Sequence, residues 1–176
     1  QLCASNQPLL KETDYLKIVE YKTGALVAAA CKVGAIIGGA SPSQQEGLYQ
    51  FGLYLGIAFQ VADDHLDYSA TRNNLGKTLG QDLMQGMITL PLLHLLQSCS
   101  HEERQQLAKK IESKTIEAND LVRITTMMEE YGSLQHTTAC SQEYIDAALL
   151  KLDSFPDSPS KQALVVVADY MVNRDR

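Results

Sequence analysis

One stretch constrains the fold of this chain more than any other: residues 56–68, with the sequence GIAFQVADDHLDY. Its apolar residues recur with helical spacing, yet it carries three carboxylates. Each residue of an α-helix turns by about 100°, so Asp67 lies about 40° and Asp64 about 100° from Asp63. Gln60, at about 60° on the same geometry, lies between them. The stretch therefore predicts a helix with one oxygen-lined stripe on an otherwise packed surface.

These three carboxylates repel one another, and the stretch contains no lysine or arginine to neutralise them. Burying them unpaired would cost several kcal/mol or raise their pKa values. A hard divalent cation removes the conflict, and Mg²⁺ binds one or two protein carboxylates while keeping water or phosphate oxygens in its other positions. A D-D-x-x-D turn is thus expected to hold Mg²⁺ against a diphosphate, with Asp63, Asp64 and Asp67 as candidate ligands. The alternative is an acidic, solvated helix end.

Two further stretches extend this pattern. Residues 20–26 read EYKTGAL, within a predicted helix rich in small residues, and residues 75–92 contain GKTLGQDL followed by TLPL. Together with F-Q-x-x-D-D-x-x-D they resemble the trans-isoprenyl (polyprenyl) diphosphate synthase family, from about Leu2 to the C-terminus. In that family F-Q-x-x-D-D-x-x-D is the second aspartate-rich motif. G-K-x-x-G-x-D-L with T-L-P-L is the next block, and the K-T pair binds diphosphate.

The resemblance implies an all-α, isoprenoid-synthase-type helical bundle, of which residues 1–176 would form one segment, the C-terminal half. It implies a magnesium-dependent transferase that condenses isopentenyl diphosphate with an allylic diphosphate to give an all-trans polyprenyl diphosphate. The catalytic residues that it implies are Lys22, Thr23, Gln60, Asp63, Asp64 and Lys77. Both lysines would contact diphosphate, and Thr23 and Gln60 would line the reacting centre.

Two features depart from the family pattern. Met87 stands where the family often has a lysine, three residues before Leu90-Pro91. The first aspartate-rich motif is also missing, because Asp14 is the only aspartate before Asp63. We therefore expect the first motif to come from a missing N-terminal half or from a partner chain, in a homodimer or heteromer. Half of a bundle would also expose an apolar face.

Two other functions compete with the enzyme. A non-catalytic or half-site subunit of a heteromeric prenyl diphosphate synthase is consistent with Met87 and with the missing first motif, whereas the intact acidic turn favours the enzyme. A plain helical interaction module would bind neither metal nor diphosphate. It leaves the co-occurrence of the acidic turn and the 76–91 block unexplained.

Composition excludes several other classes. A net charge of −6 argues against nucleic-acid binding, which requires a basic face. The four cysteines contain no C-x-x-C pair, so they predict neither a zinc ribbon nor a disulfide framework. No stretch has the ~18–20 apolar residues of a membrane span, and no signal peptide is visible. These features predict a cytoplasmic protein, with an organellar lumen such as that of the mitochondrion as the alternative.

Helical spacing and capping residues predict seven helices. Ser41 and Pro42 read as an N-cap and first residue, Ser100 to Glu103 as a capping box, and Gly132 as a C-cap. Asp82 could cap a helix through Leu96 or place a carboxylate next to the metal ligands. His65 points away from the acidic stripe and is predicted to be non-catalytic. The expected helices cover residues 14–37, 42–68, 82–96, 101–114, 116–131, 133–155 and 159–173.

Overall fold

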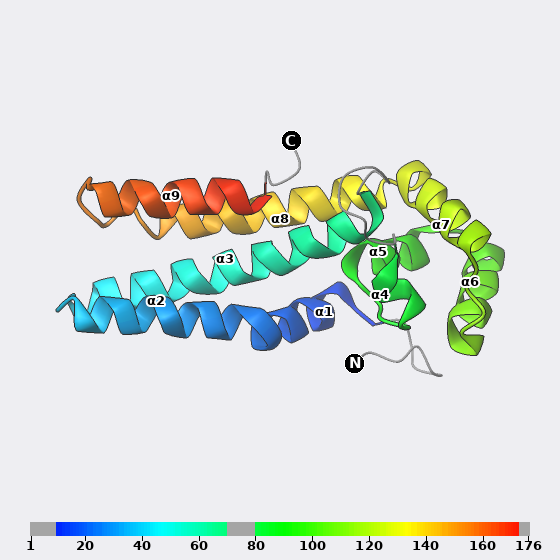
Figure 1. The fold of residues 1–176 in the computed structure, drawn as a ribbon, viewed down its shortest axis with the longest axis horizontal. Coiled ribbons are helices and arrows are strands. Elements are labelled where there is room, and N and C mark those ends of the chain that lie inside the picture. The colour runs from blue at the N-terminus through cyan, green and yellow to red at the C-terminus, as the bar shows by residue number, and fades with distance from the viewer. Residues whose placement is uncertain (1–9, 70–79, 173–176) are drawn as a thin grey trace. The chain divides into compact units, whose positions relative to one another are not determined.

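The computed structural model describes residues 10–69 and 80–172, and every regular element within these ranges is a helix (Figure 1). This confirms the all-α prediction. The elements are α1 (Glu12–Val19), the π-helix η1 (Glu20–Gly24), α2 (Ala25–Ile37), α3 (Pro42–Ser69), α4 (Gln81–Met84), α5 (Leu90–Ser98), α6 (His101–Ser113), α7 (Ala118–Glu130), α8 (Ser133–Leu150) and α9 (Pro159–Val172).

The helices belong to two compact units. Unit 1 comprises Gln1–Tyr15 and Asp63–Thr138, and unit 2 comprises Leu16–Ala62 and Ala139–Arg176. Helix α3 runs unbroken through the boundary, so its last turns belong to unit 1 and the remainder to unit 2. The predicted extent of one segment over residues 1–176 stays a prediction.

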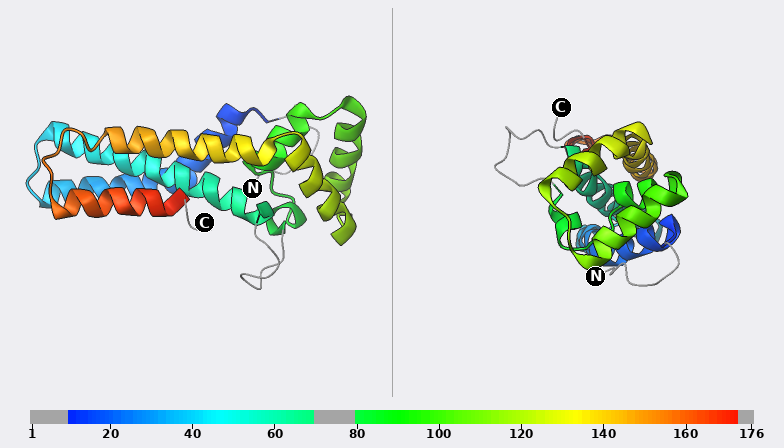
Figure 2. Two further views of the ribbon diagram at one scale, coloured as in Figure 1. Left: turned by 90° about the horizontal axis from the view of Figure 1, so that it is seen from above. Right: turned by 90° about the vertical axis from the view of Figure 1, so that its right-hand side faces the viewer.

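Unit 2 is built around the apolar face of α3, which packs against the end of α8 and against α9 (Figures 1 and 2). Its buried core residues are Phe51, Leu55, Ala58, Ile145, Ala148, Leu152 and Ala168. On another face of α3 the backbone of α2 approaches closely. A Cβ at Gly52 would lie 2.7 Å from the Val27 carbonyl oxygen. The small residues of both helices therefore allow this close approach.

Unit 1 has its own core, formed by α4 to α7, the end of α3 and the start of α8. Tyr68 is buried in it, and its hydroxyl accepts a 3.5 Å hydrogen bond from Thr89. Burial raises the pKa of Tyr68, so this phenol stays neutral. The other buried core residues are Leu83, Leu92, Leu95, Leu96, Cys99, Leu107, Ile111, Ile124, Met127, Met128 and Leu134.

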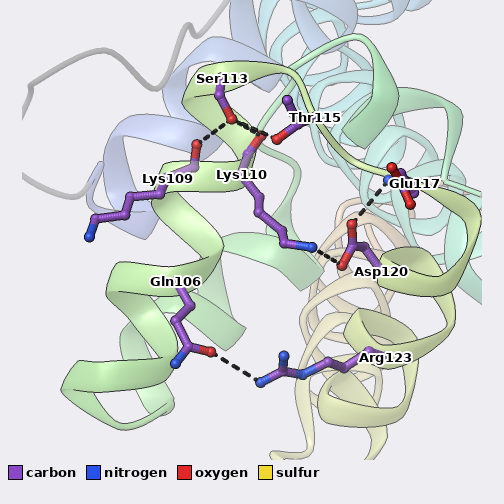
Figure 3. A network of polar contacts seen from close by, with 8 residues as sticks. All are labelled: Gln106, Lys109, Lys110, Ser113, Thr115, Glu117, Asp120 and Arg123. Carbon is purple, nitrogen blue, oxygen red and sulfur yellow. Dashed lines mark hydrogen bonds and ion pairs between the residues drawn. The ribbon is translucent and has the colours of Figure 1, made fainter.

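Exposed polar contacts join α6 to α7 on the surface of unit 1 (Figure 3). Lys110 pairs with Asp120, and Arg123 donates a 3.4 Å hydrogen bond to Gln106. Exposed pairs of this kind contribute little to stability because water and salt screen them. The packing of α6 against α7 is therefore stabilised mainly by their buried residues, such as Leu107 and Ile124.

Most predicted helix ends are confirmed. Ser100 and Glu103 form a complete capping box, and Pro42 is the first residue of α3. Gly132, with a φ of 71°, donates its N–H to the Glu129 carbonyl and ends α7. The Ser158 hydroxyl accepts from the Lys161 N–H at 3.1 Å and begins α9.

Three predicted helices differ from the structure. Residues 14–37 do not form one α-helix, because the π-helix η1 interrupts it. The helix expected over 82–96 is divided into α4 and α5: Gly86 adopts a φ of 75°, and Pro91 opens a new helix after the extended Thr89. Helix α8 ends at Leu150 instead of Phe155, because the next residues bond three residues back, as Lys151 N–H does to Ala148 at 2.9 Å.

Within the described ranges, no helix combines the length and apolar character that crossing a membrane requires.

Candidate functional site

The three aspartates of the acidic turn lie on the last turns of α3, in unit 1, and differ in burial. Asp63 is exposed, Asp67 is half-buried, and Asp64 is only 3% exposed. A charged carboxylate as buried as Asp64 needs hydrogen-bond donors, because desolvation disfavours its charged form. The turn is thus an acidic surface with one buried member, not a uniformly solvated helix end.

Asp64 receives a donor from α1. The Tyr15 hydroxyl donates a hydrogen bond of 2.5 Å to Asp64 Oδ2, and Tyr15 is itself 3% exposed. Sequence reasoning missed Tyr15, since a tyrosine on an apolar helix face reads as packing. Its only signal was a buried-face position carrying a polar atom that requires a partner.

Asp67 caps helix α4. Its Oδ1 accepts the Gln81 N–H and its Oδ2 accepts the Asp82 N–H, both at 3.1 Å. The residue at the N-cap position itself, Gly80, has no side chain to do this. Gly80 adopts a φ of 68°, and a Cβ there would meet Leu121 at 2.1 Å. The interpretation of Asp82 as the cap of a helix through Leu96 is therefore wrong, because Asp67 supplies the cap.

The side chains of this turn offer carboxylate oxygens as metal ligands, the ligand type that Mg²⁺ prefers. A carboxylate has about four lone-pair sites, so Asp64 and Asp67 can accept these hydrogen bonds and still bind a cation. Within residues 10–69 and 80–172, no three histidine, cysteine or acidic side chains come together as a metal-holding group. Mg²⁺ usually binds through one or two carboxylates and keeps water or phosphate oxygens, so the turn fits it without such a group.

In unit 2 the structure brings two other predicted residues together. Thr23 Oγ1, in the π-helix, donates a 3.1 Å hydrogen bond to Gln60 Oε1 on α3. The next residue, Gly24, is buried, and a Cβ there would lie 3.3 Å from the Leu53 carbonyl oxygen. Isolated π-helical turns occur often at functional sites. The π-helix thus presents Thr23 to α3 where Gly24 lets the two backbones approach.

The remaining predicted residues have separate surroundings. Lys22 is exposed on the π-helix, and Lys77 lies outside the described residues. His65 Nδ1 lies 3.4 Å from Thr138 Oγ1, and its non-catalytic status stays a prediction. Met87 is half-buried in the connection between α4 and α5, where its N–H donates to the Asp82 carbonyl at 2.8 Å.

Comparison with known proteins gives a consistent result. The polyprenyl synthetase family model matches residues 1–128. The octaprenyl diphosphate synthase of Escherichia coli (strain K12) is 38% identical over 176 residues, which are all of this chain and 54% of that protein. Component 2 of the heptaprenyl diphosphate synthase of Bacillus subtilis (strain 168) is 34% identical over 160 residues, 91% of this chain and 45% of that protein.

A solved structure is also similar. The polyprenyl synthase from Caulobacter crescentus CB15, complexed with calcium and isoprenyl diphosphate, superimposes with a TM-score of 0.91 at 35% identity. The match covers 100% of this chain and 54% of that one. This likeness confirms the predicted isoprenoid-synthase type of helical fold.

The chain spans about half the length of the curated relatives it matches. The family model nevertheless covers most of its residues, including the π-helix and the acidic turn. The chain belongs to the polyprenyl synthetase family.

Proposed function

We propose that this chain serves a trans-prenyltransferase that condenses isopentenyl diphosphate with an allylic diphosphate to give a polyprenyl diphosphate. The observation that carries the proposal is the acidic turn at the end of α3, in which Asp64 and Asp67 have partners from α1 and α4. These contacts orient two carboxylates within a sequence that the polyprenyl synthetase model matches. A solvated acidic helix end would not need them.

In this proposal Asp63, Asp64 and Asp67 hold Mg²⁺, directly or through water. Bound Mg²⁺ supplies positive charge that stabilises the diphosphate leaving group as the allylic C–O bond ionises. The Caulobacter polyprenyl synthase, solved with calcium and isoprenyl diphosphate, supports a divalent cation and a prenyl diphosphate as ligands. Magnesium itself remains part of the proposal.

The other residues act on the substrates. Lys22 and Lys77 contact diphosphate oxygens, and exposure leaves the Lys22 ammonium accessible to them. Thr23 donates to Gln60 and thereby fixes the orientation of the amide beside the developing allylic cation. The proton lost from the new carbocation goes to the released diphosphate, so no side chain is assigned as a general base.

A second candidate is a subunit of a two-component synthase. The B. subtilis relative is named as component 2 of a heptaprenyl diphosphate synthase. That name describes the B. subtilis protein as one part of a synthase with more than one component. One face of α2 also carries an apolar stripe: Leu26, Val33 and Ile37 are 74%, 52% and 82% exposed. An exposed stripe of this kind favours association with another chain or another part of the protein. The intact acidic turn keeps the enzyme first.

The decisive test is an isopentenyl-transfer assay on the intact protein that contains this chain, after its mass has been measured. We expect Asp63→Ala to lower kcat/KM by about 10²-fold or more, the scale for losing a group that stabilises transition-state charge. Asp153→Ala, at an exposed position in the turn after α8, is the matched control and should leave the rate unchanged. Equal kcat/KM for wild type and Asp63→Ala would contradict the proposal.

The same preparation separates the two candidates. A single gene product with transfer activity supports the enzyme in one or more identical copies. Activity that appears only after a second, different chain is added supports the two-component subunit. Light scattering on the active fraction then gives the number of chains in the assembly.

A further inference from the structure

The contact between Tyr15 and Asp64 joins two segments of unit 1 that lie 49 residues apart in the sequence. Tyr15 is on α1 and Asp64 is near the end of α3. Both residues are 3% exposed, so water has little access to the hydrogen bond. The contact is thus a property of the packed interior and not an incidental surface pair.

Burial gives this hydrogen bond its importance. Asp64 is the one buried carboxylate of the acidic turn, and an ionised buried carboxylate depends on its donors to remain charged. Tyr15 bonds Oδ2 of Asp64 and thereby restrains the orientation of the carboxyl group. Partners that orient metal-binding carboxylates typically contribute 10–100-fold to metal affinity.

Helix α1 is itself held at its start by two other contacts within unit 1. Glu12 Oε2 lies 3.0 Å from His136 Nε2 on α8, and Gln97 Nε2 on α5 donates to the Leu10 carbonyl at 3.1 Å. Tyr15 follows Glu12 by three residues, so the two side chains lie on the same face of α1. The tyrosine hydroxyl therefore reaches Asp64 from the first turn of α1, which these contacts hold within unit 1.

We propose that Tyr15 is a positioning residue of the acidic turn: it orients Asp64 for the divalent cation without touching the cation or the substrates. This inference rests on the proposed function, because it requires Asp64 to be a metal ligand. It assigns to α1 a role in the site that neither the acidic motif nor the K-T pair contains.

The test is a titration of the purified chain with Mn²⁺, followed by water-proton relaxation, with no substrate present. Tyr15→Phe removes only the hydroxyl, and we expect it to weaken Mn²⁺ binding about 10-fold or more. The matched control is Tyr131→Phe, because the Tyr131 hydroxyl also donates to a carboxylate of unit 1, Glu103, at 2.8 Å, but on α6. The control should bind Mn²⁺ within about twofold of wild type, since Glu103 lies outside the acidic turn.

A double-mutant cycle shows whether Tyr15 acts through Asp64. Asp64→Asn should weaken Mn²⁺ binding, and adding Tyr15→Phe to it should have no further effect. The inference is overturned if Tyr15→Phe alone binds as wild type does. It is equally overturned if Tyr15→Phe weakens binding by the Asp64→Asn variant as much as it weakens binding by the wild type. A wild-type chain that binds no Mn²⁺ overturns the proposed metal site together with this inference.

A second measurement covers the case in which Tyr15→Phe does not fold. In wild-type protein labelled with ¹³C on the tyrosine rings, Mg²⁺ is expected to shift the Cζ signal of Tyr15 and to leave that of Tyr131 in place. An unmoved Tyr15 signal at saturating Mg²⁺ overturns the inference without any substitution.

Discussion

The two parts of the continuous helix α3 are stabilised by different interactions. In unit 2 the helix packs through carbon: Phe51 and Ala58 are fully buried, and Gly52 and Gly56 let α2 approach. In unit 1 its last turns carry carboxylates, of which Asp64 is matched to a tyrosine hydroxyl and Asp67 to two backbone N–H groups. Side-chain volume therefore determines how α3 packs in unit 2. Hydrogen bonds to its carboxylates determine how its last turns pack in unit 1.

This difference shows which substitutions each part can accept. Where two helix backbones lie in contact, one added methyl group typically costs about 1–3 kcal/mol, because interiors have almost no free volume. A polar contact is less sensitive to a small change in side-chain volume. It is lost when its donor or its acceptor is removed, and the remaining partner is then left without a hydrogen bond. We therefore expect large effects for small-to-large changes where the backbone of α2 approaches α3 in unit 2, and graded effects for polar deletions in unit 1.

The largest effect is expected for Gly52→Ala. The new Cβ would lie 2.7 Å from the Val27 carbonyl oxygen and 2.9 Å from the Ala28 Cα, and backbone atoms cannot rotate away as a side chain can. We expect the free energy of unfolding in urea to fall by about 2 kcal/mol or more. Gly47→Ala, on the same helix, is the matched control. Its Cβ would meet the Phe155 ring at 3.5 Å, an ordinary contact.

The control should be neutral or stabilising by up to about 1 kcal/mol, because alanine favours a helix over glycine. Equal changes in stability for the two substitutions would contradict the inference that the close approach of α2 requires glycine at position 52.

The sequence predicted the packing of unit 2 well. The sequence around residues 20–26 predicted a helix rich in small residues, and Ser41-Pro42 located the start of α3. The π-helix could not be predicted in this way, since its extra residue per turn has no signature in apolar periodicity. It is recognised from its backbone hydrogen bonding, in which the Ala25 N–H donates to the Glu20 carbonyl five residues earlier.

A smaller effect is expected for Asp67→Ala, which removes both acceptors from the start of α4. Loss of a capping side chain costs about 1 kcal/mol, and the Gln81 and Asp82 amides lose their partner. Hydrogen exchange measured by NMR should show faster exchange at these two amides. Asp67→Asn is the matched variant, because it keeps one oxygen and should have an intermediate effect. Unchanged exchange in Asp67→Ala would contradict the capping role.

The sequence predicted the acidic residues of the candidate site but not the groups that bond to them. Helical spacing placed Asp63, Asp64 and Asp67 on one stripe, and the structure shows that stripe as part exposed and part buried. The donors to Asp64 and Asp67 come from residues 49 positions earlier and 14 to 15 positions later. Local periodicity contains no information on such distant contacts, so Tyr15 and the capping of α4 emerge only from the fold.

The smallest effect on the free energy of unfolding is expected from a change of pH, and we expect it to arise from His94 in unit 1. Burial lowers the pKa of His94 most, the neighbouring His136 lowers it further, and Glu12 opposes them. The rings of His94 and His136 stack with centroids 4.4 Å apart. Because the folded protein binds this proton less readily than the unfolded chain, stability is present above the unfolded pKa of about 6.5 and declines as pH falls below it.

His94→Asn should therefore flatten the decline in the free energy of unfolding between about pH 7.5 and pH 5.5, the window that contains the unfolded pKa of histidine. Urea titrations at several pH values measure the slope in the wild type and in the variant. Gly47→Ala, in unit 2, should keep the wild-type slope, because it changes no titratable group. If His94→Asn shows the wild-type slope, the stacked pair does not link folding to protonation. If the decline is steeper in His94→Asn than in the wild type, His94 binds its proton more readily in the folded protein. Its pKa would then be raised by folding, the opposite of the direction inferred from its burial.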